Sequence, residues 1–129
     1  MNGVHLTADL QRCRGSVALD DPAALRLLCL GAVEAAGLQA VGELFHRFAP
    51  PGGVTGVVLL AESHLALHTW PEHGAVTLDV YVCNVSTDNA HRAEAVVAAL
   101  RGAFDPGRCD ARRITRAALA PPLPRHAPP

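Results

Sequence analysis

Residues 61–74, AESHLALHTWPEHG, concentrate polar and aromatic side chains in a chain that is otherwise largely aliphatic. The stretch holds Ser63, three histidines, a tryptophan and two glutamates. A hydroxyl next to imidazoles can serve nucleophilic or acid–base chemistry, and histidines can also bind metal. These residues are therefore the first candidates for a functional site.

Two common forms of such chemistry do not fit the spacing. His64 and His68 are four residues apart, and on a strand this places them roughly 13 Å apart, too far to share one zinc ion. The residues around Ser63, AESHL, lack the Gly-x-Ser-x-Gly elbow that exposes the nucleophile of many hydrolases. We therefore predict neither a metal site nor a Ser-His-Asp hydrolase.

Hydrophobic periodicity and turn residues indicate the elements that position this stretch. The expected strands are residues 3–10, 40–48, 54–70, 75–83 and 109–119, and the expected helices are 20–37 and 86–104. The order β-α-β-β-β-α-β predicts an α+β fold, a two-layer α/β sandwich whose mostly antiparallel sheet carries both helices on one face. We expect one domain over residues 1–119 and a disordered Pro-rich tail over 120–129.

A turn at residues 71–74 would fold position 63 opposite about position 83. Ser63 and Cys83 would then lie at one level on neighbouring strands, with His68 part-way towards the turn. Each residue alone fits an ordinary strand or core position. Their joint occurrence predicts a hydroxyl, a thiol and an imidazole that converge near one edge of the sheet.

Composition limits the possible partners and the location. The net charge of −1 gives no electrostatic reason to expect binding to nucleic acid or to an anionic membrane. The longest apolar run, GVVLLA, is too short to span a bilayer, and the N-terminus lacks the pattern of a signal peptide. The four cysteines form no CxxC pair, which disfavours a disulfide framework. We therefore expect a cytoplasmic protein.

All eleven basic residues are arginine, and the chain contains no lysine. Pyridoxal-phosphate enzymes and Schiff-base aldolases attach their carbonyl chemistry to a lysine amine. This absence excludes both classes unless a partner chain supplies the lysine.

The motifs FHRF, GVTGVVLLAESHLALHTWPE and the D…C of LDVYVC resemble the prokaryotic S-adenosylmethionine decarboxylase proenzymes. The resemblance runs from about residue 3 to about residue 116. It implies that the Ser63 hydroxyl attacks the carbonyl carbon of Glu62 and that the chain cleaves itself there. The products are a β chain of residues 1–62 and an α chain of residues 63–129. Ser63 becomes a pyruvoyl group, which forms a Schiff base with the substrate amine.

The resemblance also implies a role for each matched residue. His68 corresponds to the acid–base residue of processing, and Cys83 corresponds to the acid that returns a proton after decarboxylation. Thr55 stands where relatives usually carry serine and keeps the hydroxyl that supports cleavage. Candidate substrate-binding residues are Glu72 for the ribose hydroxyls, Trp70 and Phe48 for the adenine, and Leu65 through its backbone.

By the same resemblance, we expect S-adenosylmethionine as substrate, an aminopropyl donor for spermidine synthesis as product, and a homodimer with active sites completed across its interface. Departures around the motif leave two other readings open. The loop APPGG, the run EHGAVTLDVYVCN and the segment VSTDNAHRA differ from the usual family pattern. They allow a pyruvoyl-dependent decarboxylase of ornithine or arginine, or an unprocessed regulatory homologue.

Overall fold

Helix α1 (Pro22–Ala35) lies within the predicted helix of residues 20–37. In the computed structural model, which describes residues 2–84, 88–116 and 120–125, the Asp21 carboxylate accepts hydrogen bonds from the backbone N–H groups of Ala23 and Ala24. Gly37 follows the helix with φ +79°, a conformation that favours glycine. Helix α2 covers Ala90–Phe104, whereas residues 86–87 of the predicted helix lie outside the described ranges.

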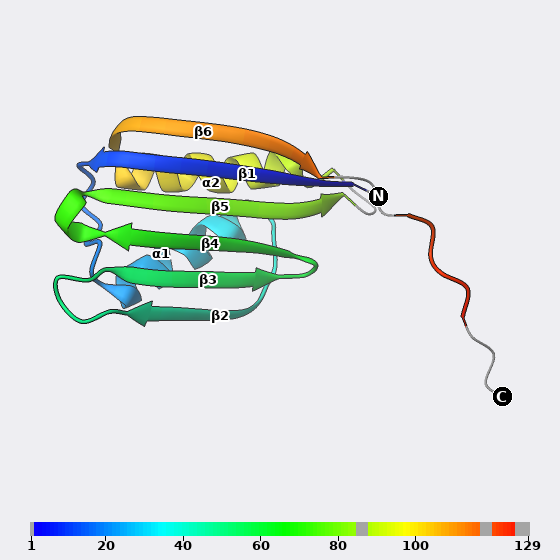
Figure 1. Cartoon of the computed structure of the whole chain (residues 1–129), viewed down its shortest axis with the longest axis horizontal. Coiled ribbons are helices and arrows are strands. Elements are labelled where there is room, and N and C mark those ends of the chain that lie inside the picture. The colour runs from blue at the N-terminus through cyan, green and yellow to red at the C-terminus, as the bar shows by residue number, and fades with distance from the viewer. Residues whose placement is uncertain (1, 85–87, 117–119, 126–129) are drawn as a thin grey trace.

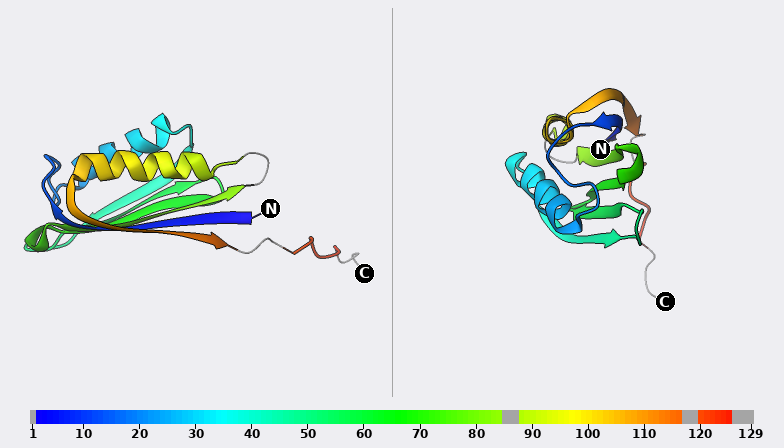
Figure 2. Two further views of the ribbon diagram at one scale, coloured as in Figure 1. Left: turned by 90° about the horizontal axis from the view of Figure 1, so that it is seen from above. Right: turned by 90° about the vertical axis from the view of Figure 1, so that its left-hand side faces the viewer.

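Six antiparallel strands form one sheet in the order β2-β3-β4-β5-β1-β6. Their bounds are β1 (Asn2–Cys13), β2 (Ala40–Arg47), β3 (Val54–Leu60), β4 (Ser63–Trp70), β5 (Ala75–Asn84) and β6 (Pro106–Arg116). Both helices cover the same face of the sheet, and within the described residues the other face carries no helix or strand (Figures 1 and 2). The predicted two-layer α/β sandwich is therefore confirmed.

The predicted number of strands was wrong, because residues 54–70 form two strands rather than one. The chain reverses direction at Ala61 and Glu62, so that Leu60 pairs with Ser63 and β3 lies beside β4. This turn uses a positive φ of +56° at Glu62 instead of a glycine or asparagine. Periodicity alone could not reveal it, because the apolar residues continue on both sides.

Alternation along the strands separates a helix-facing side from an open side. On β5, Val76, Leu78, Val80 and Val82 are buried beneath the helices. The intervening residues Thr77, Asp79, Tyr81 and Cys83 therefore lie on the open face. On β4 the buried series is Leu65, Leu67 and Thr69, which leaves His64 and His68 on the open face.

The last strand begins at Pro106, three residues earlier than predicted, and the predicted residues 117–119 lie outside the described ranges. Of the predicted tail, residues 120–125 adopt neither helix nor strand and extend away from the sheet (Figure 1), and 126–129 are not among the described residues. Neither α1 nor α2 is long and apolar enough to cross a membrane.

Candidate active site

The turn between β3 and β4 contains the predicted cleavage bond. Glu62 is exposed and lies in the left-handed region at φ +56°, and Ser63 follows it as the first residue of β4. A left-handed conformation costs a residue other than glycine about 1–2 kcal/mol. The peptide bond between Glu62 and Ser63 therefore lies at an accessible and strained point of the chain.

Ser63 and Cys83 lie at the same end of the sheet, but their pairing differs from the prediction. His64 pairs with Tyr81, so the register places Ser63 level with Val82 rather than with Cys83. The turn is centred between positions 72 and 73, because Trp70 pairs with Ala75. By alternation, Ser63 belongs to the helix-facing series and Cys83 belongs to the open face. Cys83 itself pairs with Gly3 on β1.

His68 is held by Thr55 on the open face of the sheet. The two residues pair across β3 and β4, and His68 Nδ1 lies 3.0 Å from Thr55 Oγ1. The His68 side chain is exposed, so its second ring nitrogen, Nε2, can reach a reacting group. The contact places the Thr55 hydroxyl beside the imidazole that the resemblance assigns to processing.

The predicted convergence of Ser63, Cys83 and His68 does not occur within one chain. Ser63 and His68 are five residues apart on β4, a separation of about 16 Å at the usual strand rise. Ser63 starts β4 next to the turn of residues 61–62, whereas His68 lies near the short 3-10 helix η1 (Pro71–His73) at the other end of the sheet (Figure 1).

A pocket of about 190 Å³ brings together five of the predicted residues at the end of the sheet that contains η1. The predicted residues in its lining are Phe48, Thr55, His68, Trp70 and Glu72. Small-molecule sites usually enclose about 300–1,000 Å³. The pocket is therefore too small to enclose a nucleoside without walls from another source.

The loop before β3 approaches this pocket closely. A Cβ atom at Gly53 would lie 2.0 Å from the Thr69 carbonyl oxygen, so only glycine fits there. The buried Thr69 hydroxyl accepts a hydrogen bond from the Val54 backbone N–H and donates one to the Leu19 carbonyl. Sequence reasoning missed this role of Thr69, which fixes the pocket floor.

Leu65 is not a pocket residue. Its side chain is 1% exposed and packs in the core beneath the helices. Only its backbone remains available for the predicted contact with substrate, because β4 alternation directs the side chain away from the open face.

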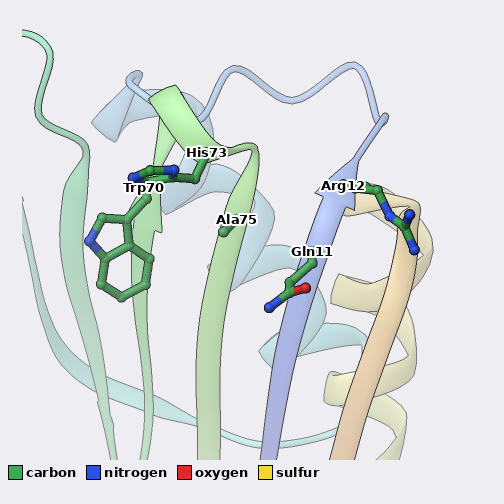
Figure 3. Close-up of a pocket in the computed structure, with 5 residues that line it drawn as sticks. All are labelled: Gln11, Arg12, Trp70, His73 and Ala75. Atoms are coloured by element: carbon green, nitrogen blue, oxygen red, sulfur yellow. The ribbon is translucent and has the colours of Figure 1, made fainter.

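A second pocket of about 500 Å³ lies beside Trp70 (Figure 3). Its lining residues are Gln11, Arg12, Trp70, His73 and Ala75. It shares only Trp70 with the predicted set, so the smaller pocket is the better candidate for the nucleoside. Trp70 lines both pockets.

A cluster that sequence reasoning missed occupies the open face next to Cys83. Asp79 Oδ2 accepts hydrogen bonds from His64 Nε2 at 2.8 Å and from His5 Nε2 at 2.9 Å. The three residues come from β4, β1 and β5 and are each partly buried. The alternation of β5 places Asp79, Tyr81 and Cys83 on one face, but the pairing with β1 that adds His5 depends on the fold.

The ligand atoms of His5, His64 and Asp79 lie within 4.8 Å of one another, a donor set that could hold a divalent metal. The surroundings favour hydrogen bonding instead. Metal-bound imidazoles usually donate their second ring N–H to an acceptor. Here the other ring nitrogen of His5 lies 3.4 Å from the Arg116 guanidinium, which can only donate.

Residues 4–117 match the family model described as S-adenosylmethionine decarboxylase. The chain belongs to this family. It is 45% identical over 91 residues to the S-adenosylmethionine decarboxylase proenzyme of Aquifex aeolicus. These residues make up 70% of this chain and 65% of that protein. The proenzyme of Persephonella marina is 47% identical over 81 residues, or 63% of this chain and 59% of that protein. The chain thus matches less than two thirds of the length of these two members.

A solved member of the S-adenosylmethionine decarboxylase family has the same fold. The crystal structure of the adenosylmethionine decarboxylase from Aquifex aeolicus aligns with a TM-score of 0.81 and 33% identity. The alignment covers 96% of this chain and 98% of that chain. The six-stranded sheet with two helices on one face is therefore the family architecture.

Proposed function

We propose that this chain is a self-cleaving, pyruvoyl-dependent S-adenosylmethionine decarboxylase proenzyme. The observation that carries the proposal is the placement of the Glu62–Ser63 bond in a strained and accessible turn within a chain of this family. The names of the relatives favour S-adenosylmethionine over ornithine or arginine as substrate, and they favour a processed enzyme over a regulatory homologue. The product would be the aminopropyl donor for spermidine synthesis.

Cleavage begins at the turn. The Ser63 hydroxyl attacks the carbonyl carbon of Glu62 and converts the peptide bond into an ester. Elimination breaks the ester, releases residues 1–62 as the β chain and leaves a dehydroalanine at position 63. Its imine tautomer is hydrolysed by water, which releases ammonia and leaves a pyruvoyl group on the α chain. His68 of the second protomer in the proposed homodimer moves the proton of the elimination step, oriented by the Thr55 hydroxyl at 3.0 Å.

The pyruvoyl group supplies the electron-accepting carbonyl that decarboxylation of an amino acid requires. A chain without lysine fits this source of a carbonyl, because Ser63 provides it. Cys83 lies on the open face at the same end as the new α-chain N-terminus. From there its thiol returns a proton to the substrate α-carbon, since thiols can act as general acids.

The pocket of about 190 Å³ binds the nucleoside part of the substrate. Glu72 can accept hydrogen bonds from the two ribose hydroxyls, since a carboxylate offers only acceptors. Trp70 and Phe48 provide aromatic faces for the adenine, and the substrate sulfonium gains cation–π attraction near them.

The functional unit in this proposal is a homodimer formed through the open faces. Large apolar side chains on this face remain exposed, namely Leu44 at 69%, Leu59 at 50% and Ile114 at 45%. Exposed apolar surface of this kind marks an interface. If two open faces pack in opposite directions, Cys83 and the end of the sheet that carries the β3–β4 turn of one protomer lie against the pocket and His68 of its partner.

The four cysteines are free in the structure, a state that suits the reducing cytoplasm proposed here as the location. Within this proposal the open face binds the second protomer and the small-molecule substrate. No nucleic acid or membrane partner is part of the proposal.

An intact-mass spectrum of the denatured protein tests the proposal directly. We expect two chains, residues 1–62 and 63–129, with the α chain lighter by one ammonia than a chain that begins with serine. Ser63→Ala should give one uncut chain without decarboxylase activity. Ser16→Ala, which changes an exposed loop serine, should cleave like the native protein. A single uncut native chain would end the proposal.

A further inference from the structure

The ring of Tyr81 is confined on the open face by residues from three other strands. The His64 ring stacks on it at a centroid distance of 5.9 Å, and the His5 ring meets it edge-on at 5.8 Å. The Arg116 guanidinium carbon lies 5.6 Å from the ring centroid. A Cβ atom at Gly3 would lie only 2.7 Å from the Tyr81 hydroxyl, so the ring rests against this backbone. These contacts fix the direction of the hydroxyl.

The two imidazoles beside Tyr81 are themselves held in place. Both donate to the same carboxylate oxygen of Asp79, at 2.9 Å from His5 and 2.8 Å from His64. Because a shared acceptor ties two strands to β5, neither ring can rotate without breaking a hydrogen bond. The Asp79 carboxylate thus stabilises the walls around Tyr81.

The hydroxyl that these walls orient contacts Cys83. The Cys83 thiol donates to the Tyr81 hydroxyl oxygen with a distance of 3.5 Å between Sγ and Oη. The two residues are separated by one position on β5 and share its open face. The contact therefore joins Tyr81 to the residue that the proposed function assigns to proton return.

The electrostatics of the pair favour a tyrosine that keeps its proton. The hydrogen bond with Cys83 raises the pKa of Tyr81, and burial and the negative charge of a Cys83 thiolate act in the same direction. The Arg116 guanidinium lowers the pKa of Tyr81 by a smaller amount. A phenol that remains protonated can donate a hydrogen bond to a neighbouring thiolate.

We propose that Tyr81 is a positioning residue that orients the Cys83 thiol and then donates a hydrogen bond to the thiolate left after proton transfer. The inference rests on the proposed function, in which Cys83 gives its proton to the substrate α-carbon. In that step the S–H bond breaks, the C–H bond forms and the S–H electron pair stays on sulfur. Tyr81 keeps its own proton, and water reprotonates the thiolate.

The test uses Tyr81→Phe, which retains the ring and removes only the hydroxyl. Alkylation of the native protein and the variant with iodoacetamide is followed from pH 6 to pH 10, and peptide mapping reads each cysteine separately. The midpoint of the Cys83 profile should move up by about one pH unit, as expected for the loss of a hydrogen bond to a charged group. The partly exposed Cys13 and Cys109 serve as internal controls and should not change.

The groups that face this pair are His5, His64, Asp79 and Arg116, and Tyr81→Phe leaves all four in place. The fraction of cleaved chain should remain native. The turnover number for S-adenosylmethionine should fall about tenfold while the Michaelis constant stays within about twofold, because the substrate pocket is not altered.

Gly3→Ala provides a second variant that keeps the hydroxyl but displaces it, and it should shift the Cys83 profile in the same direction. An unchanged Cys83 profile in Tyr81→Phe would overturn the proposal, as would an equal shift of Cys13 and Cys109. A shifted Cys83 profile with native turnover would also overturn it. Failure of the proposed function would appear as an uncut native chain. The Cys83 profile of such a chain can still be measured by alkylation, so the two failures are distinguishable.

Discussion

Ser63 and His68 lie near opposite ends of β4, about 16 Å apart at the usual strand rise, although both are required for the proposed cleavage. Ser63 starts the strand after the strained Glu62, and His68 is bound to Thr55 near the pocket. A side chain cannot bridge this distance within a strand. In the proposed dimer, the histidine of one protomer would act at the cleavage site of its partner.

Complementation between two inactive variants tests this arrangement. Ser63→Ala and His68→Ala should each remain uncut when produced alone. When they are co-expressed, mixed dimers should cleave only the His68→Ala chain, because it has an intact Ser63 and receives His68 from its partner. Intact-mass spectra distinguish the two chains. Absence of cleavage in confirmed mixed dimers would contradict an active site shared between protomers.

Replacing Glu62 by glycine should slow cleavage. Glycine adopts the left-handed conformation of this position without the cost of about 1–2 kcal/mol that glutamate bears, so the uncut chain becomes more stable relative to the transition state. The rate should fall about tenfold, measured by the appearance of the α chain over time after synthesis. Glu62→Gln is the matched control, since it keeps the strain and removes the charge. If both variants slow equally, the carboxylate matters and the strain does not.

Cys83→Ala should leave cleavage intact and reduce decarboxylation. Loss of a general acid typically lowers turnover by about 10²–10⁴-fold. Chain cleavage is followed by intact mass and carbon dioxide release by a radiolabelled substrate. Cys109→Ala, at a partly exposed position of β6, should behave like the native enzyme in both assays. Unimpaired carbon dioxide release by Cys83→Ala would remove this thiol from the mechanism.

Glu72→Gln should weaken substrate binding more than it slows the reaction. An amide has one acceptor oxygen where a carboxylate has two, and loss of a charge-assisted hydrogen bond costs enough to raise the Michaelis constant about tenfold. The turnover number should change less than about threefold. Glu34→Gln, an exposed residue of α1, is the control and should alter neither constant. Native kinetics for Glu72→Gln would exclude the ribose contact.

The stability of the fold should fall at alkaline pH because of Cys29. Burial raises the pKa of this thiol to about 12, whereas an unfolded thiol titrates near 8.5. The folded chain therefore holds a proton that the unfolded chain loses, so the free energy of unfolding decreases as pH rises from about 8.5 towards 12. The decrease is at most about 1.4 kcal/mol per pH unit.

Urea unfolding of the native protein and of Cys29→Ala at pH 8 and pH 10 isolates this contribution. Cys29 is fully buried, so the variant should start from a lower free energy of unfolding at pH 8. The difference between the two proteins should become smaller at pH 10, since only the native chain carries the thiol. If the difference in the free energy of unfolding stayed the same, the protonation of Cys29 would not differ between the folded and unfolded chains in this pH range.

The sequence by itself determined the faces of the strands and the ends of α1. Apolar residues alternate with polar ones along residues 75–83, and the structure buries the apolar Val76, Leu78 and Val80 beneath the helices. Asp21 and Gly37 mark the helix ends because capping is a local interaction. The motif around Ser63 also identified the family, since it depends only on residue order.

Only the tertiary structure decided how these residues meet. No glycine or asparagine in the sequence indicates the turn at Glu62. This turn divides one predicted strand into two. Pairing between strands then set Ser63 level with Val82 and brought His5 to Asp79 across β1 and β5. Register is a non-local property, because hydrogen bonds between distant segments fix it. Periodicity tells which face a side chain occupies, but not which side chain lies opposite.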